Sequence, residues 1–211
     1  MNSDGETNEH GNFWLTCSRP WSDRSIDGTR HLAMSELPGF VTAVAGFRAT
    51  ICVPAASKDI LRIIRNEADA DAEAAVKARC AYEDAVLKLV RRLGWKDFEV
   101  LVDLILSRTG WARVAVLGSV GEDIDIEAEN ASTEETAFVQ VKSQASQAVL
   151  DDYVSRFSAQ RDHYDRMIFA VHDYEGTLTL PEGLPVHVWG EQRIAQLVVK
   201  HGLGHWIAKR V

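Results

Sequence analysis

The sequence predicts an α/β protein in which a mixed central sheet is flanked by helices and preceded by a small β-rich module. Two observations predict this fold class. Apolar residues at helical spacing mark three helices, over residues 67–93, 97–110 and 146–160. Between the last two helices lie three strand-like runs with no helix among them, at residues 113–117, 123–129 and 138–143. This order favours a mixed sheet over a parallel one, because parallel neighbours need long crossover connections.

The remaining elements follow from the same patterns. Asp97 is expected to cap the second helix, whose buried side carries Phe98, Leu101, Val102 and Ile105. After the third helix we expect strands over 167–171 and 185–189, and then helices over 191–200 and after residue 202.

The first 66 residues have a different character. Residues 1–12 are almost entirely polar and are expected to be disordered. Short β-like runs follow, at residues 13–17, 39–45 and 47–53. Ser57 is expected to cap a short helix that buries Ile60, Leu61, Ile63 and Ile64. The sequence therefore predicts a tail (1–12), a small β-rich N-terminal module (13–66) and a larger domain (67–211).

Composition and charge narrow the class of protein. The chain is 46% apolar and 26% charged, as in a globular protein, and no apolar run approaches the roughly 20 residues of a membrane-spanning helix. Cys17, Cys52 and Cys80 lack metal-like spacing and, with no secretory signal at the N-terminus, favour a reducing cytoplasm. The net charge of −8 argues against a nucleic-acid partner without deciding the matter, since a basic rim can coexist with an acidic total.

Acidic and basic groups gather on the second and third of the consecutive strands. Alternate residues of a strand share a face, which groups Asp123, Asp125, Glu127 and Glu129. On the next strand Gln140 and Lys142 share a face. If the two strands are neighbours, a carboxylate lies beside both residues. Metal-assisted cleavage of a phosphodiester uses such a layout, because oxygen ligands hold Mg²⁺ and a lysine stabilises the charge that builds on phosphorus.

A second interpretation is a solvated strand face with a surface lysine, and periodicity alone favours it, because half-buried strands commonly alternate in this way. The order of the motifs favours the metal site. The motifs are, in order, Phe98-Glu99 at a helix start, Gly110-Trp111, a glycine-rich turn leading to Ile124-Asp125-Ile126, and Gln140-Val141-Lys142. This ordered set, over about residues 82–172, resembles the Mrr-like branch of the PD-(D/E)xK restriction endonucleases.

The resemblance implies a restriction-endonuclease-like αβββαβ core and a role for each matching residue. Lys142 matches the catalytic lysine and Glu99 the helix acid. Asp125 matches the metal-binding acid because it lies between two isoleucines, and Asp123, on the same face, remains its rival. Gln140 stands where most members have Asp or Glu. A neutral amide is a weaker Mg²⁺ ligand than a carboxylate. Binding of the metal would therefore depend more on Glu99, Asp125 and the backbone carbonyl of Val141.

The function implied by the resemblance is Mg²⁺-dependent hydrolysis of DNA in restriction or defence, with Mn²⁺ able to substitute. Ser143, Gln144 and Arg156 are expected to contact the nucleic acid. Residues 13–66 are expected to supply target recognition, a partner contact or a homodimer interface. The alternative is a nuclease-fold module that binds nucleic acid or a protein partner without cleaving, which the amide at position 140 and the acidic net charge keep open. A third option is cleavage of RNA or branched DNA by the same site.

Overall fold

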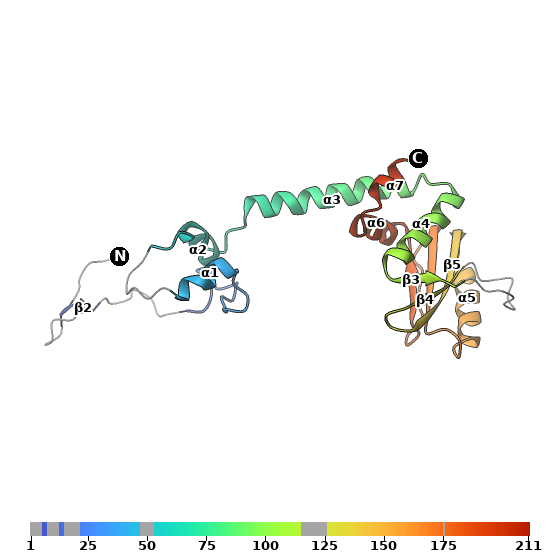
Figure 1. Cartoon of the computed structure of the whole chain (residues 1–211), viewed down its shortest axis with the longest axis horizontal. Helices are drawn as coiled ribbons and strands as arrows, with labels where there is room; N and C mark the ends of the chain where they lie inside the picture. The colour runs from blue at the N-terminus through green and yellow to red at the C-terminus, as the bar shows by residue number, and fades with distance from the viewer. Residues whose placement is uncertain (1–5, 8–12, 15–21, 47–52, 115–125, 175) are drawn as a thin grey trace. The chain divides into compact units, whose positions relative to one another are not determined.

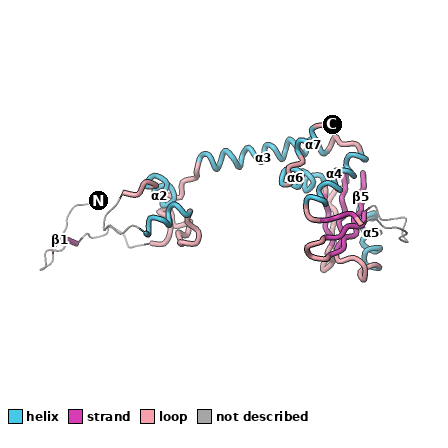
Figure 2. Tube along the Cα trace, viewed as in Figure 1, coloured by secondary structure: helices cyan, strands magenta, loops and turns pink. Residues whose placement is uncertain are grey.

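The structure of the protein, a computed structural model, describes residues 6–7, 13–14, 22–46, 53–114, 126–174 and 176–211 (Figures 1 and 2). It divides the chain into two compact units, Met1–Ala75 and Val76–Val211. The boundary falls inside α3 (Ala70–Val90). No helix in the described ranges is long and apolar enough to cross a membrane. The division of the sequence at residue 66 stays a prediction.

The described part of the first unit contains helices and loops with only two short strands, so the prediction of a β-rich module is wrong there. Two short strands, β1 (Glu6–Thr7) and β2 (Phe13–Trp14), pair antiparallel. Residues 39–45, expected to form a strand, lie instead in α1 (Gly39–Thr42) and the 3-10 helix η1 (Ala43–Gly46). The carbonyl of Pro38 accepts the first amide hydrogen bonds of α1. A local turn of this kind satisfies the backbone without a partner strand.

A further strand was expected over residues 47–53. Residues 47–52 lie outside the described residues, and Val53 is in no strand. The predicted short helix is present as α2 (Ser57–Ile64). Its N-cap is Ala56 with no side-chain hydrogen bond, so the prediction that Ser57 caps it is wrong. Ile63 is buried, whereas Leu61 is 48% exposed because it lies on the opposite side of this short helix.

The second unit contains a mixed five-stranded sheet, which confirms the predicted fold class. In spatial order its strands are β3 (Trp111–Arg113), β4 (Ile126–Asn130), β5 (Glu135–Ala145), β6 (Arg166–Tyr174) and β7 (Val186–Trp189). The first three pair antiparallel, whereas β5, β6 and β7 pair parallel. α5 (Gln147–Ala159) supplies the crossover from β5 to β6 that a parallel pair requires.

Helices cover both faces of this sheet. One face packs against the end of α3, α4 (Trp95–Arg108), α6 (Glu191–Lys200) and α7 (Gly204–Ala208), and the other packs against α5. The strands divide their residues between the two faces with the predicted period of two. Ile126, Ala128 and Val139 belong to the α4 side, whereas Phe138 and Phe169 belong to the α5 side.

The start of α4 differs from the prediction by two residues. Its N-cap is Gly94, whose carbonyl accepts the amide of Phe98, so Asp97 lies in the first turn and does not cap. There the Asp97 carboxylate interacts favourably with the positive end of the helix dipole. It also forms an ion pair with Arg210, whose guanidinium nitrogen lies 3.3 Å from the carboxylate oxygen. The predicted buried stripe is confirmed, since Phe98, Leu101, Val102 and Ile105 are all fully buried. Gly110, with φ +90°, makes the turn from α4 into β3.

Candidate active site

The Gln140-Val141-Lys142 segment lies in the second half of β5. In the part of the chain that the structure describes, β4 pairs with β5 only as far as Ile126 opposite Val139, whereas β6 pairs with β5 up to Ala145. Val141 packs on the α4 side of the sheet. Gln140 is buried, at 1% exposure, and Lys142 is half-buried. The segment therefore runs beyond the described β4–β5 ladder, and its side chains alternate between the α4 side and the α5 side of the sheet.

The Lys142 amine has a defined neighbour on α5. Its Nζ lies 5.0 Å from the centre of the Tyr153 ring, and the Arg156 guanidinium lies 5.1 Å from the same ring. Tyr153 itself is 9% exposed and packs in the core beneath α5. A cation near an aromatic face is attracted to the negative charge of the ring, so Tyr153 holds the amine on the α5 side of β5.

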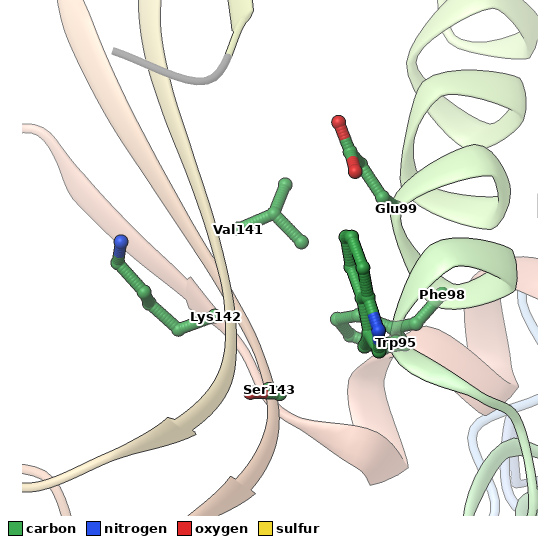
Figure 3. Close-up of a pocket in the computed structure, with 6 residues that line it drawn as sticks. All are labelled: Trp95, Phe98, Glu99, Val141, Lys142 and Ser143. Atoms are coloured by element: carbon green, nitrogen blue, oxygen red, sulfur yellow. The ribbon is translucent and has the colours of Figure 1, made fainter. Parts of the chain in front are cut away.

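Glu99 lies on α4 and faces a small cleft between this helix and β5. The cleft, of about 250 Å³, is lined by Trp95, Phe98, Glu99, Val141, Lys142 and Ser143 (Figure 3). Phe98 forms its buried floor, and Glu99 is half-buried at its side. Because Glu99 follows Phe98 directly, the burial of the aromatic residue in the core fixes the direction in which the carboxylate leaves the helix. The cleft thus joins the helix acid to the β5 segment.

Glu99 and Lys142 line this cleft from opposite sides of β5. Figure 3 shows Val141 and Lys142 leaving the strand in opposite directions, with Glu99 on the side of Val141. This follows from the period of two, because Val141 belongs to the α4 side and Lys142 lies over Tyr153 of α5. The Glu99 carboxylate and the Lys142 amine therefore lie on different sides of β5.

The expected acid Asp125 and its rival Asp123 both lie outside the described residues. The nearest described acid of that strand face is Glu127, paired opposite Phe138. Burial of the Tyr164 hydroxyl raises the pKa of this group, and the nearby Glu127 carboxylate raises it further. The charge of Glu127 is therefore felt on the α5 side of the sheet, where Tyr164 lies. Asp125 therefore stays a prediction.

The donor chemistry fits a hard cation. A carboxylate at Glu99, an amide oxygen at Gln140 and the Val141 carbonyl are the oxygen ligands that Mg²⁺ prefers. Within the described ranges, no three His, Cys, Asp or Glu side chains gather closely enough to hold a metal ion. A complete ligand set therefore needs the acid predicted at position 125.

The residues expected to contact nucleic acid are not all at one place. Ser143 is exposed and lines the cleft with Glu99. Gln144 is exposed but lines a different depression, together with Ser146, Asp173 and Tyr174. Arg156 makes an ion pair with Asp152 at 2.9 Å on α5. Of the three, only Ser143 is brought to the cleft, and contact with nucleic acid stays a prediction for all of them.

Two residues at the site have roles that the sequence did not predict. Tyr153 lies on α5, and its contact with Lys142 depends on the crossover between β5 and β6. Trp95 has the spacing of a buried residue, three positions before Phe98, yet it is 62% exposed. The sequence contained a signal for this exposure. Trp95 directly follows Gly94 and so is the first residue of the helix, where the buried stripe ends and side chains are often exposed to solvent.

Comparison with known proteins relates part of the second unit to a known family. Residues 90–174, from the end of α3 to the end of β6, match the family model described as a restriction endonuclease, of the Mrr catalytic type. Over these residues, less than half of the chain, the protein is similar to the Mrr-like restriction endonucleases, as the motifs indicated. The matched segment contains Glu99, Gln140, Val141 and Lys142, and it overlaps the segment whose motifs carried the resemblance.

A solved structure is also similar to this chain. It is described as the DNA modification-dependent restriction endonuclease AspBHI, with 13% sequence identity and a TM-score of 0.39. The alignment covers 61% of the present chain and 39% of AspBHI, so the chain spans well under half of that protein's length. No curated protein matches the sequence.

Proposed function

We propose that the protein is a Mg²⁺-dependent DNA endonuclease that hydrolyses phosphodiester bonds in restriction or defence, in the cytoplasm. The observation that carries the proposal is the cleft between α4 and β5. Glu99 and Lys142 both line this cleft, and both lie in the segment that matches the restriction-endonuclease family. Both residues stand at the motif positions that the family uses for a metal-binding acid and a catalytic lysine.

The proposed roles follow from the chemistry of each group. Glu99, Asp125, Gln140 and the Val141 carbonyl would hold Mg²⁺, which supplies Lewis-acid activation of the phosphate and of the attacking water. Lys142 brings a positive charge to the phosphate and stabilises the charge that develops there. Tyr153, 5.0 Å from the lysine amine, limits the positions that this amine occupies before substrate binds. Ser143, exposed at the mouth of the cleft, is placed to donate a hydrogen bond to the DNA backbone.

The test is direct incubation of the purified protein with plasmid DNA, single-stranded DNA and RNA. Each substrate is incubated with Mg²⁺, with Mn²⁺ and with EDTA. We expect DNA cleavage with either metal and none with EDTA. RNA cleavage alone would replace the proposed substrate, and cleavage that persists in EDTA would remove the metal from the proposal.

A second function, binding without cleavage, is favoured by one observation. Gln140 occupies the position of a family acid, and it is 1% exposed. A buried neutral amide gives weaker support to a cation than an acid does. In that case the protein would shift DNA in a gel and leave every substrate intact in either metal. A Gln140→Glu variant that then gained cleavage would identify the missing charge as the cause.

A further inference from the structure

The cleft beside Glu99 carries an exposed indole that the proposed roles do not use. Trp95, the first residue of α4, is 62% exposed, whereas Trp111, the first residue of β3, is 7% exposed. Burial of a large aromatic side chain stabilises the fold more than burial of most other residues does. Core packing therefore does not explain an indole that is exposed to solvent at the candidate site. Trp95 shares the cleft lining with Glu99, Val141 and Ser143.

The orientation of the ring places it on the substrate side of the cleft. Figure 3 shows the indole of Trp95 extending from α4 into the space that Val141 and Glu99 also enter. The helix fixes this arrangement, because residues four apart lie one above the other, and Glu99 follows Trp95 by four positions. A nucleotide bound against the indole would therefore lie next to the proposed metal-binding acid.

Positive charge accompanies the ring. Lys96 Nζ lies 5.3 Å from the centre of the Trp95 ring, and Lys142 lines the same cleft. A cation–π contact between exposed groups is weaker than the stacking of a nucleobase on an aromatic ring, so a base can displace the Lys96 amine from the indole. The displaced amine then remains within reach of the phosphate of that nucleotide. An exposed aromatic ring with lysines beside it is the combination that binds unpaired nucleic acid.

We propose that Trp95 is the stacking platform for an unpaired nucleobase, so that the preferred substrate is DNA with an unpaired nucleotide next to the cut site. This inference rests on the proposed function. A paired base has both faces covered by its neighbours in the duplex, so only an unpaired one can stack on the indole. The lysine beside the ring, Lys96, favours this polyanionic ligand over an apolar surface of a partner protein.

The experiment measures binding by the full chain in EDTA, where metal-dependent cleavage is stopped. Fluorescein-labelled oligonucleotides would be a perfect duplex, the same duplex with one unpaired nucleotide, and a single strand. The variants are Trp95→Ala, Trp95→Leu and Trp95→Phe, with Val100→Ala, on an exposed position of the same helix, as the matched control. Thermal melts establish that each variant is folded.

We expect the wild type to prefer the two substrates with unpaired bases. Trp95→Ala should weaken their binding by roughly 5- to 150-fold, the range for loss of one stacked base, with little effect on the perfect duplex. Trp95→Leu should behave as Trp95→Ala, because leucine restores apolar volume but no π face, and Trp95→Phe should keep most of the affinity. A 2-aminopurine at the unpaired position should lose fluorescence on binding to the wild type and keep it with Trp95→Leu.

Equal binding of all three oligonucleotides by the wild type and by Trp95→Ala would overturn the inference, as would unchanged 2-aminopurine fluorescence. Trp95→Leu that binds as the wild type does would show an apolar contact instead of stacking and would also overturn it. These outcomes are distinct from failure of the proposed function. If the wild type cleaves DNA in Mg²⁺ while Trp95 has no effect, only the stacking platform fails.

Discussion

Replacement of Lys142 by alanine should remove cleavage and leave the fold intact. The side chain is half-buried, and its described contact is with the ring of Tyr153 at 5.0 Å. Such a contact contributes about 0.5–1 kcal/mol at an accessible site. For a chain of this size, about 1 kcal/mol corresponds to roughly 2–4 °C in melting temperature. The Arg156 guanidinium, 5.1 Å from the same ring, remains in the variant. We therefore expect Lys142→Ala to melt within about 4 °C of the wild type.

Catalysis should change far more than stability. A positioned group that stabilises developing charge contributes roughly 10²- to 10³-fold to a rate, and we expect a loss in that range for Lys142→Ala. Initial rates of plasmid nicking in Mg²⁺ measure it. Lys88→Ala, which removes an exposed lysine of α3, is the matched control and should cleave at the wild-type rate. Equal rates for wild type and Lys142→Ala would place the activity at another site, and a melting temperature lowered by more than about 10 °C would show a structural role instead.

Three further predictions concern the metal, the pH and the first unit. Glu99→Gln should raise the Mg²⁺ concentration for half-maximal nicking at least about tenfold, because the cation loses a charged ligand. Hydrogen bonds from Arg91 lower the pKa of Glu191, so this pair stabilises the fold above the ordinary glutamate pKa and the stabilisation is lost as the pH falls through the lowered value. Urea unfolding should show Glu191→Gln less stable than the wild type by up to about 1 kcal/mol at pH 7, with the difference shrinking as the pH falls below the ordinary glutamate pKa. A truncated protein that begins at Glu67 keeps α3 whole, and we expect metal-dependent nicking with a lost substrate preference or an altered oligomeric state in sizing chromatography.

Each of these has a contradicting result. An unchanged metal requirement in Glu99→Gln would exclude that carboxylate from the metal site. A stability difference in Glu191→Gln that does not shrink as the pH falls below the ordinary glutamate pKa would show that packing, and not charge, is responsible. A folded truncated protein with unchanged specificity and unchanged assembly would leave residues 13–66 without the role predicted for them.

The sheet and the helix that carry the candidate site were predictable because their patterns are local. The period of two in Ile126–Glu129 and in Phe138–Lys142 matches the observed faces of β4 and β5. The stripe from Phe98 to Ile105 matches the buried side of α4. In both cases the alternation repeats over several residues, and burial of one whole face outweighs the preference of any single residue.

Short segments were less predictable, because few residues decide them. The run 39–45 has β-branched residues, yet it forms α1 and η1, where hydrogen bonds to Pro38 replace the partner strand that a β-strand needs. Asp97 has the right side chain for an N-cap, but Gly94 takes that position, and α4 begins two residues earlier than predicted, at Trp95. Either residue suits a helix start, and the path of the chain into the core selects one of them.

The sequence by itself determined the fold class and the presence of a helix acid and a Gln-x-Lys strand, since these depend on residue order and periodicity. Only the tertiary structure decided how the site is assembled. It placed Tyr153 against Lys142, brought Glu99 to the opposite side of β5, and left Trp95 open at the cleft. These relations join α4, β5 and α5 across the two faces of one sheet. Such contacts depend on how the helices pack on the sheet, which no local pattern of residues encodes.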